Sequence, residues 1–353
     1  MRLHILIDSI YAQKFYEFIN KNFNADEHLF VINAEKLKYL SEETIIKLNI
    51  RKNRDDRLWL LGKASEASNI FVHSFFDNHI LAWLVLNKKI LNKTTWVLWG
   101  GDLYNYWLKN KHSLKEEVIE LLKRRVIKNI ANIIALVEED YKFVREKYKT
   151  KALYKYAFYP NPIDFLMLDN VIITYKSNNN NFKILVGNSA ASTNNHFEIL
   201  KALSMIKDQN FEVICPLSYG ETNYAMQVAD FGKKLFGERF IPLVEFLPPE
   251  EYSKILAYVD VAIFNHKRQQ ALGNILALLY LGKKVYIRSD VSTWSFLNRL
   301  GITVFDTIKI FNKPEDLLLD FSKDAALKNR SIVKREFSEE RCVELWRDIF
   351  DSR

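Results

Sequence analysis

The sequence predicts an α/β protein built from two doubly wound domains that face each other across a central cleft. Two observations predict this class. Short apolar runs alternate with longer amphipathic stretches along most of the chain, which is typical of a parallel sheet covered by helices on both faces. With 353 residues and 48% hydrophobic residues, the chain is also too long for one ordinary core and has enough apolar side chains for two.

In the first half, apolar runs of strand length are separated by amphipathic stretches. The expected strands lie at 3–7, 29–32, 69–73, 95–99 and 133–137, with helices at 14–22 and 79–87 between them. Parallel strands end at the same edge of a sheet, and open α/β sheets bind their ligands beyond that carboxyl edge. We therefore expect one domain to hold a donor substrate and the other an acceptor.

The alternation is interrupted at 159–164, where two prolines fix a turn, and at 177–181, a polar tract of one serine and four asparagines. Strands are then expected at 182–186, 212–215, 261–264 and 284–287. The breaks predict a first domain at 1–165, a linker at 166–181 and a second domain at 182–336. The last stretch, 337–353, is expected to be a helix able to cross back to the first domain.

Composition argues against several other classes of protein. Cys215 and Cys342 lie in apolar segments without a partner at metal-ligand spacing, so neither a disulfide framework nor a zinc site is expected. Asp8 interrupts the apolar start too early for a signal peptide. No apolar run approaches the roughly 20 residues that span a bilayer. We expect a soluble or peripheral protein of a reducing cytoplasm.

The net charge of +8 is concentrated at 109–155, which holds 13 Lys/Arg against 7 Asp/Glu. Nucleic acid, anionic lipid and a diphosphate all bind such a segment, and a merely solvated basic face has the same composition. No nucleic-acid-binding signature is present, so nucleic acid is not expected and lipid headgroups are favoured. The cations of the amphipathic stretch 121–128 are expected to face a membrane: Lys123, Arg124, Arg125 and Lys128.

Three segments of the second half carry donor-binding chemistry. A strand leads into Gly187, Asn188 and Ser189, and a helix opens near Asn194. Glycine permits close approach of the backbone, and free N–H groups at a helix start attract phosphate. An ordinary turn with an asparagine cap would give the same pattern.

The second of these segments follows the strand at 261–264. It is a dense polar loop ahead of an apolar helix, in which an arginine fork or a lysine is able to stabilise a departing nucleotide diphosphate, although a solvated loop remains the alternative. The third segment, 243–252, is an extended stretch turned by two prolines, which is also the pattern of a well-capped helix start. The expected donor-binding residues of these two segments and of the strand end near 219 are Lys267, Arg268, Gln269, Gln270, Asn274, Glu245, Phe246 and Tyr219.

In the first half, Asp102 follows two glycines after a predicted strand, and His73 ends another strand with Asp77 nearby. A carboxylate or imidazole at a strand end is suited to act as general base for an acceptor hydroxyl. Asp102 is therefore the first candidate and His73 the second. A turn or cap aspartate and a core histidine are the alternatives.

Several cofactor motifs are absent from the sequence. No Asp-X-Asp follows a strand, since Asp55-Asp56 lies in a charged, non-strand stretch, and there is no Walker loop, Gly-X-Gly-X-X-Gly or Cys-X-X-Cys. NAD-dependent chemistry and nucleotide hydrolysis are disfavoured. No metal and no cofactor are expected.

Taken together, four strings resemble the TDP-N-acetylfucosamine:lipid II N-acetylfucosaminyltransferases, the 4-alpha-L-fucosyltransferases of glycosyltransferase family fifty-six. The strings are ILVGNS followed by Asn-His, Arg-Gln-Gln before a glycine and a helix, Trp-X-X-Trp-Gly-X-Asp-Leu-Tyr, and the Glu-Phe-Leu…Tyr segment. The correspondence spans nearly the whole chain, including His73, Trp294 and Trp346, and is sparse before residue 70.

The resemblance implies a GT-B fold of two Rossmann-like domains and a peripheral enzyme on the cytoplasmic face of the bacterial inner membrane. It implies transfer of 4-acetamido-4,6-dideoxygalactose from a TDP-sugar to a polyprenyl-diphosphate-linked glycan in the synthesis of enterobacterial common antigen. By position, the 187–189 loop and the 268–270 loop match the donor domain, while Asp102 and His73 match the first domain. The chain departs from the family at 190–191, 220–222 and 266–267.

The stereochemistry and the exact reaction stay open at this point. Many retaining GT-B enzymes carry Glu-X7-Glu, and the corresponding places here hold Gln269 and Ala277, which favours an inverting, base-assisted attack. A nucleotide-sugar epimerase, a glycosyltransferase using another nucleotide sugar and a non-catalytic interaction protein are the alternatives.

Overall fold

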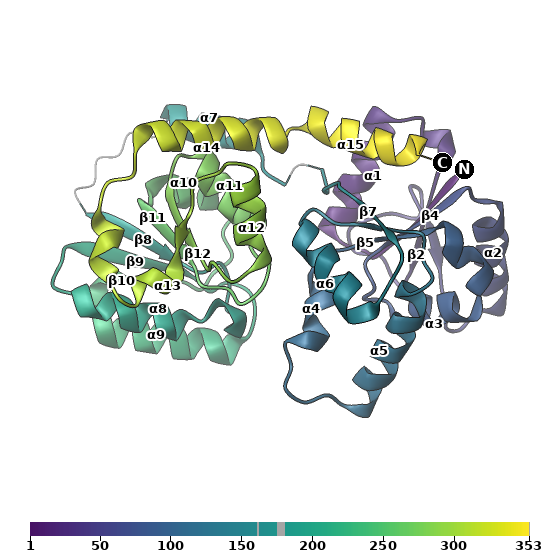
Figure 1. Cartoon of the computed structure of the whole chain (residues 1–353), viewed down its shortest axis with the longest axis horizontal. Coiled ribbons are helices and arrows are strands. Elements are labelled where there is room, and N and C mark those ends of the chain that lie inside the picture. The colour runs from purple at the N-terminus through teal and green to yellow at the C-terminus, as the bar shows by residue number, and fades with distance from the viewer. Residues whose placement is uncertain (161, 175–180, 353) are drawn as a thin grey trace. The chain divides into compact units, whose positions relative to one another are not determined.

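A computed structural model describes residues 1–160, 162–174 and 181–352 of the chain. The chain divides into two compact units: unit 1 comprises Met1–Asn161 and Glu339–Arg353, and unit 2 comprises Pro162–Ser338. Each unit contains one sheet flanked by helices (Figure 1). The predicted class, two parallel-sheet α/β domains, is confirmed.

Unit 1 is built on a seven-stranded sheet in the order β3-β2-β1-β4-β5-β6-β7, and every pair of neighbouring strands is parallel. The chain order reverses between β1 and β4, the place where doubly wound sheets open a crevice at their carboxyl edge. The strands are β1 Arg2–Leu6, β2 His28–Asn33, β3 Ile46–Leu48, β4 Asn69–His73, β5 Thr94–Val97, β6 Asn132–Ile134 and β7 Leu153–Lys155. The α-helices are α1 Ile10–Asn22, α2 Arg54–Glu66, α3 Asn78–Leu86, α4 Gly101–Trp107, α5 Leu114–Ile127, α6 Glu138–Tyr148 and α15 Glu339–Asp351.

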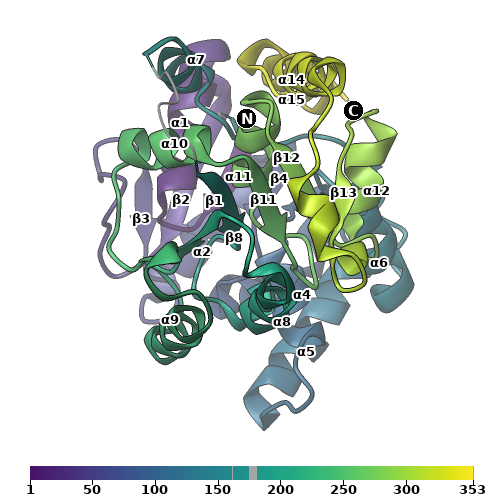
Figure 2. The ribbon, with the colours of Figure 1, turned by 90° about the vertical axis from the view of Figure 1, so that its left-hand side faces the viewer.

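Unit 2 repeats this topology on a six-stranded parallel sheet in the order β10-β9-β8-β11-β12-β13. Helices α8 and α9 lie on one side of the sheet, and α10 and α11 lie on the other (Figure 2). The strands are β8 Phe182–Val186, β9 Phe211–Pro216, β10 Phe240–Leu243, β11 Val261–Phe264, β12 Lys284–Ile287 and β13 Phe305–Asp306. The α-helices are α7 Phe165–Thr174, α8 His196–Leu203, α9 Thr222–Phe236, α10 Pro249–Tyr258, α11 Leu272–Tyr280, α12 Ser292–Arg299, α13 Thr307–Ile310 and α14 Lys323–Glu336.

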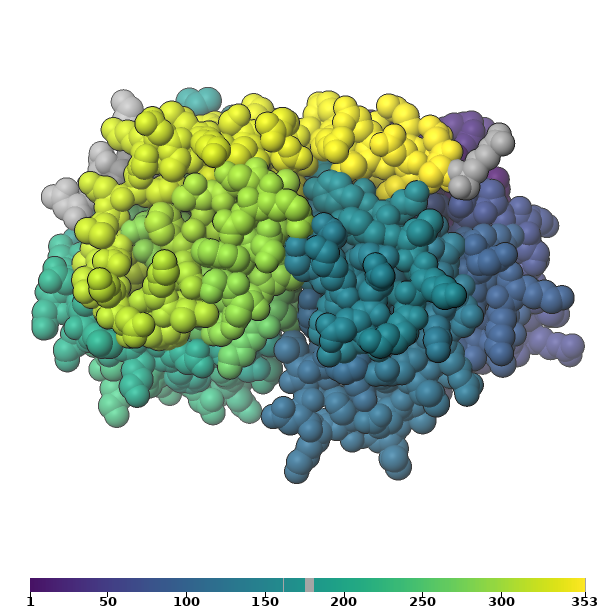
Figure 3. All heavy atoms as spheres, in the orientation of Figure 1, coloured from purple at the N-terminus to yellow at the C-terminus, as the bar shows by residue number. Residues whose placement is uncertain are grey.

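Helix α15, at the end of the chain, packs in unit 1 rather than in the unit that precedes it in sequence. Its Trp346 is fully buried, and the indole Nε1 donates to the carbonyl of Phe158 at 2.9 Å. Its Phe350 carbonyl accepts from Arg2 at 3.1 Å. The C-terminal residues accordingly lie on the surface of unit 1 beside the N-terminal ones (Figure 3). Apolar positions on one face of α15 complete the cover over β1 and β4.

The segment expected as a linker, 166–181, carries helix α7 of unit 2. Its Leu168 and Val171 are buried, and its Asp169 carboxylate accepts from Tyr280 and from Arg330, both at 2.8 Å. The apolar sequence of this helix packs on unit 2 because it offers a continuous buried face, which the sequence reading missed. Residues 177–180 of the asparagine-rich tract lie outside the described residues.

A second difference from the sequence prediction is that each sheet has short strands at its two edges. Strands β3, β7, β10 and β13 contain three, three, four and two residues, too few to show a periodic pattern. Among the described residues, no helix combines the length and apolar content that crossing a bilayer requires.

Candidate active site

The polar loops of unit 2 meet at the carboxyl edge of its sheet. Strands β8 and β11 are neighbours in the sheet, so the loop at 187–195 and the loop at 265–271 leave adjacent strand ends. Helix α8 then runs to one side of the sheet and α11 to the other. This divergence is the switch point at which doubly wound sheets bind ligands.

Gly187 forms the sharp turn after β8. Its φ is +73°, a conformation that side-chain-bearing residues rarely adopt, and its N–H donates to the carbonyl of Ile263 at 2.9 Å. A Cβ at this position would lie 2.4 Å from His196 Nε2 and 2.9 Å from Asn194 Oδ1. Glycine is therefore required here for packing against the protein itself, and its amide is not available to a ligand.

We expect Gly187→Ala to lower the free energy of unfolding by about 1–3 kcal/mol more than Gly237→Ala does, because it adds overpacking to backbone strain. Gly237 also has a positive φ, +59°, but a Cβ there would meet nothing within 4 Å. Urea unfolding followed by circular dichroism measures both changes. Equal losses would show that the contact with His196 is easily relieved.

Asn194 is buried and organises the first loop. Its Oδ1 accepts from the N–H of Asn188 at 3.1 Å and from His266 Nε2 at 2.7 Å. Its Nδ2 donates to the carbonyl of Ser189 at 3.0 Å. Because an amide oxygen only accepts, His266 carries its proton on Nε2, and burial lowers the pKa of His266 to about 3. Asn194 is thus buried and bonded to protein groups, and its role in this structure is to support the loop.

Three residues predicted for donor binding are joined by hydrogen bonds across neighbouring loops. Gln270 Nε2 donates to Asn188 Oδ1 at 3.2 Å, and Asn188 Nδ2 donates to the Tyr219 hydroxyl at 2.8 Å. Thr193 Oγ1 donates to Gln270 Oε1 at 2.8 Å. These bonds link the loops that follow β8, β9 and β11.

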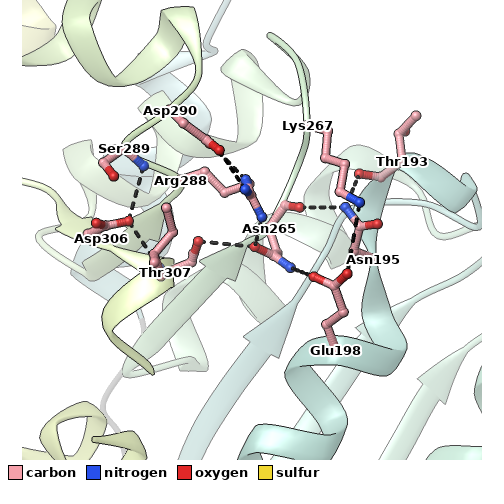
Figure 4. Close-up of polar contacts among 11 residues, drawn as sticks. Thr193, Asn195, Glu198, Asn265, Lys267, Arg288, Ser289, Asp290, Asp306 and Thr307 are labelled. Atoms are coloured by element: carbon pink, nitrogen blue, oxygen red, sulfur yellow. Dashed lines mark hydrogen bonds and ion pairs between the residues drawn. The ribbon is translucent and has the colours of Figure 1, made fainter. Parts of the chain in front are cut away.

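A second polar cluster, which the sequence reading missed, is centred on buried Asn265 (Figure 4). The Asn265 carbonyl accepts from Asn195 at 2.9 Å, and its Nδ2 donates to Glu198 Oε2 at 2.9 Å. Its Oδ1 accepts from Thr307 at 3.1 Å and from Arg288 Nη1 at 3.4 Å. Asn265 therefore ties the ends of β8, β11, β12 and β13 together.

Arg288 follows β12 and pairs with Asp290 through two hydrogen bonds of 2.8 and 2.6 Å (Figure 4). The guanidinium is thereby fixed at the carboxyl edge with one nitrogen directed to Asn265. The signal in the sequence was the same as for the other loops, since Arg-Ser-Asp directly follows the predicted strand 284–287.

The two predicted phosphate-binding cations lie in the loop after β11. Lys267 is exposed, with Nζ 3.9 Å from Glu198 Oε1. Arg268 is half-buried, and its Nη1 donates to the carbonyl of Gln269 at 2.9 Å. Helix α11 starts directly afterwards at Leu272. The residue before it, Ala271, has a φ of +56°, and no side chain of the described residues caps the first N–H groups of the helix. Cations and a helix N-terminus thus occupy one loop.

The remaining predicted donor residues lie around the same edge. Tyr219 and Phe246 are exposed aromatic residues in the loops after β9 and β10, which are joined by a hydrogen bond from the N–H of Leu217 to the carbonyl of Leu243 at 2.8 Å. Glu245 is exposed beside Phe246. Asn274 Nδ2 donates to the Tyr252 hydroxyl at 3.3 Å and so connects α11 to α10.

The structure corrects the role predicted for Asp102. This carboxylate is buried. Its Oδ2 accepts from Phe75 N–H at 3.0 Å and from Trp96 Nε1 at 2.8 Å, and its Oδ1 accepts from Trp99 N–H at 3.0 Å. Burial raises the pKa of Asp102, and three protein donors bind its two oxygens and so hold two loops in place. Asp102 is a structural residue of unit 1 and not an exposed base.

His73 is likewise buried, within a row of ring-to-ring contacts. His4 Nδ1 lies 3.1 Å from His73 Nε2, and His4 Nε2 lies 2.9 Å from His28 Nδ1. The Tyr159 hydroxyl contacts His73 Nδ1. Burial lowers the pKa of His73 to about 3, so this ring is neutral and both of its nitrogens are bonded. His73 is therefore a core histidine, the alternative to a general base that the sequence left open.

The structure also corrects the predicted membrane face of α5. Lys123 is buried, and its Nζ donates to the Asp102 carbonyl at 2.7 Å. Arg124 lies 3.3 Å from Glu120 and stacks over Trp107 at 5.3 Å. Of the four predicted cations, Arg125 and Lys128 are exposed, and Arg124 is half-buried. The Lys123 side chain points into unit 1 rather than outward as predicted, because a backbone carbonyl there accepts from its ammonium group.

A cavity of about 270 Å³ lies at the carboxyl edge of the unit 1 sheet. Asn33 and Asp77 on its wall are joined by a hydrogen bond of 2.7 Å. The same Asp77 caps α3 by accepting from His79 N–H at 2.8 Å. The cavity is lined by Asn33, Ala34, Glu35, Asn49, Arg51, Asp77 and His79, of which sequence reading had noted only Asp77.

Two Rossmann-like units with polar loops at their carboxyl edges define a protein of the GT-B fold. Solved structures of that fold are similar over the full chain. HepE from Anabaena in complex with UDP has a TM-score of 0.71 at 13% identity and covers 100% of both chains. A glycosyltransferase from Rickettsia africae has 0.67 at 14%, covering 100% of this chain and 99% of its own. WaaG, a glycosyltransferase involved in lipopolysaccharide biosynthesis, has 0.65 at 10% and covers 100% of both chains.

The family follows from the sequence model of 4-alpha-L-fucosyltransferase, glycosyl transferase group 56, which matches residues 10–315. The chain belongs to this family. It is therefore a glycosyltransferase, a hexosyltransferase that takes a nucleotide-sugar donor and a glycan acceptor. The predicted family and enzyme class are confirmed, and membership favours transfer over the epimerase and non-catalytic alternatives.

Proposed function

We propose that this glycosyltransferase moves a dideoxy-acetamido sugar, such as N-acetylfucosamine, from a TDP-sugar to a polyprenyl-diphosphate-linked glycan. The proposed setting is cell-surface polysaccharide synthesis, as in enterobacterial common antigen, with the enzyme peripheral on the cytoplasmic face of the bacterial inner membrane. Membership in the fucosyltransferase family supports the sugar class. The sequence resemblance supports TDP and the lipid-linked acceptor.

The observation that carries the donor site is the junction of loops 187–195 and 265–271, joined through Asn188 and Gln270 at 3.2 Å. Beside this junction stand Lys267, Arg268 and the uncapped start of α11. A departing nucleotide diphosphate gains negative charge as the sugar–oxygen bond breaks. Fixed cations and amide dipoles stabilise that charge.

The nucleotide base is proposed to lie against the loops after β9 and β10. Exposed aromatic rings stack on any base, and Tyr219 and Phe246 are such rings at the carboxyl edge. The Tyr219 hydroxyl accepts from Asn188, so the ring is tied to the diphosphate loop. Glu245 is placed to accept a hydrogen bond from a ribose or sugar hydroxyl.

The acceptor is proposed to bind the 270 Å³ cavity of unit 1. Its amide, carboxylate, guanidinium and imidazole side chains match the hydroxyl groups of a sugar. In the reaction, the acceptor oxygen forms a bond to the donor anomeric carbon, TDP leaves with the electron pair, and the hydroxyl proton passes to a base. Because Asp102 and His73 are buried, exposed His79 is the base that we propose.

A thermal-shift panel of TDP, UDP and GDP tests the donor class. TDP at about 100 times its dissociation constant is expected to stabilise the protein by about 2.7 kcal/mol. Asn188→Ala should reduce that shift, whereas Asn22→Ala, far along the sequence in unit 1, should not. A larger thermal shift with UDP or GDP would show that this nucleotide, and not TDP, belongs to the donor. The absence of a shift with all three would contradict the proposed donor site.

A second assay separates transfer from epimerisation. The enzyme is incubated with TDP-sugar alone and with TDP-sugar plus a polyprenyl-diphosphate glycan, and the products are resolved by chromatography. Glycan elongation only in the second mixture supports transfer. Formation of an epimeric TDP-sugar in the first mixture would support the epimerase alternative instead.

A further inference from the structure

Helix α5 has a second apolar face that is largely exposed to solvent. Leu114 is 87% exposed, Val118 57% and Leu121 52%. Their spacing of four and three residues places them in one stripe along the helix, and Arg125 continues it. The opposite face of α5 already supplies the core, since Val126 and Ile127 are buried there.

This stripe lies on a projecting part of unit 1. In both ribbon views the connection between α4 and α5, and the N-terminal part of α5, extend beyond the rest of the unit (Figures 1 and 2). Leu108, which ends α4, is also exposed. The helix start is held in place by a capping box between Ser113 and Glu116, so the projection is a formed helix and not a loose loop.

Exposed cations border the stripe. Lys111, Lys115, Arg125 and Lys128 form no ion pair within the described part of the chain. Of the nearby acids, Glu116 pairs with Lys109, whereas Glu117 keeps its charge and accepts from the Tyr106 hydroxyl at 3.0 Å. Apolar side chains flanked by unpaired cations match the boundary between acyl chains and anionic headgroups.

We propose that α5 docks unit 1 on an anionic phospholipid surface by inserting Leu114, Val118 and Leu121 between headgroups, while Lys111, Lys115, Arg125 and Lys128 bind lipid phosphates. This assignment rests on the proposed lipid-linked acceptor, and it identifies the surface by which unit 1 would bind the membrane that holds this acceptor. It differs from the sequence expectation because the inserting group is apolar and Lys123 takes no part. A partner protein would offer an apolar groove instead and would not need anionic lipid.

The test is flotation of the full-length protein with vesicles of phosphatidylcholine alone and of phosphatidylcholine mixed with phosphatidylglycerol. The triple variant Leu114→Ser, Val118→Ser, Leu121→Ser is expected to lose about tenfold or more of its binding to the mixed vesicles. The double variant Lys111→Glu, Lys115→Glu should lose about tenfold on mixed vesicles and little on neutral ones. The matched control, Leu58→Ser, Leu86→Ser, Leu327→Ser, changes three leucines that are exposed elsewhere and should bind like the original chain.

Thermal shift with TDP on the same proteins keeps the two proposals apart. Retained TDP stabilisation with lost vesicle binding supports docking through α5. Vesicle binding that survives both the triple and the double variants, or an original chain that binds no vesicles, overturns the docking surface without touching the donor site. Loss of TDP stabilisation in the original chain would overturn the donor assignment and leave the vesicle result standing.

Discussion

Lowering the pH from about 7 to about 5 is expected to unfold unit 1, because three neutral histidines in its core must take up protons. His4, His28 and His73 are stacked among Phe15, Phe71 and Phe350 and contact one another through their ring nitrogens. Burial lowers the pKa of His28 to about 4 and of His73 to about 3. Burial also lowers the pKa of His4 well below its ordinary value of 6.5.

Whether the stability rises or falls with pH depends on which state, folded or unfolded, binds more protons. Below pH 6.5 the unfolded chain protonates these rings while the folded unit does not, so stability is complete above 6.5 and falls as the pH falls toward the folded-state pKa values. Each histidine contributes about 1.4 kcal/mol per pH unit. Because the unfolded rings are only half protonated at pH 6.5, the three together remove on the order of 5 kcal/mol between about pH 6.5 and about pH 5, which is comparable with the whole stability of a small domain.

Urea unfolding between these pH values measures this loss. His28→Phe removes one of the titrating rings and should lower the pH slope by about one proton. Asn20→Ala, a change at an exposed residue without a titratable side chain, should leave the slope unchanged. A free energy of unfolding that stays constant down to about pH 5 would show that the three rings are not neutral in the folded unit.

Replacing Arg268 by alanine is expected to reduce turnover by about two to three orders of magnitude, since loss of one preorganised donor to a developing negative charge has an effect of this size. Arg268 lies in the loop that joins β11 to α11, and its Nη1 is held by the Gln269 carbonyl. Steady-state transfer of sugar to a lipid-linked acceptor gives kcat. Activity is expected to persist in EDTA if, as we propose, protein cations rather than a metal ion stabilise the leaving diphosphate.

Two further variants, one control and one comparison, show whether the effect is specific to Arg268. Arg335→Ala removes an exposed arginine on α14 that pairs with Glu336, and turnover should be unchanged. Lys267→Ala removes the neighbouring cation, and the larger of the two losses identifies the group that contacts the diphosphate. Near-normal turnover of Arg268→Ala with a large loss in Lys267→Ala would transfer the role to Lys267. Near-normal turnover of both would remove the loop from the site.

The central strands were predictable because parallel strands buried on both faces read as continuous apolar runs. The expected 182–186, 261–264 and 284–287 coincide with β8, β11 and β12. The edge strands β3, β7 and β13 were missed because two or three residues carry no period. Helix α7 was not predicted, because its sequence lies beside the asparagine-rich tract and the whole of 166–181 was interpreted as a linker.

The two loops that we propose bind the donor could be located in the sequence for a similar reason. Polar residues directly after an apolar strand must lie at the carboxyl edge, and Asn188 and Gln270 do meet there. What sequence could not give is the direction of a side chain. Asp102 and His73 stand at strand ends as expected, yet both turn inward to backbone donors or to neighbouring rings. Lys123 turns inward too, toward a carbonyl that is 21 residues away in sequence.

The placement of α15 in unit 1 has a consequence for how the polypeptide matures on the ribosome. The segment that carries Trp346 and covers Phe15 and Phe71 follows unit 2 in the chain and is translated after it, so unit 1 lacks this cover until unit 2 has been made. A fragment of residues 1–161 would expose the uncovered aromatic face to solvent and to aggregation. Expression of unit 1 by itself therefore calls for a circular permutant that joins the final helix to the N-terminus, where Arg2 already meets Phe350.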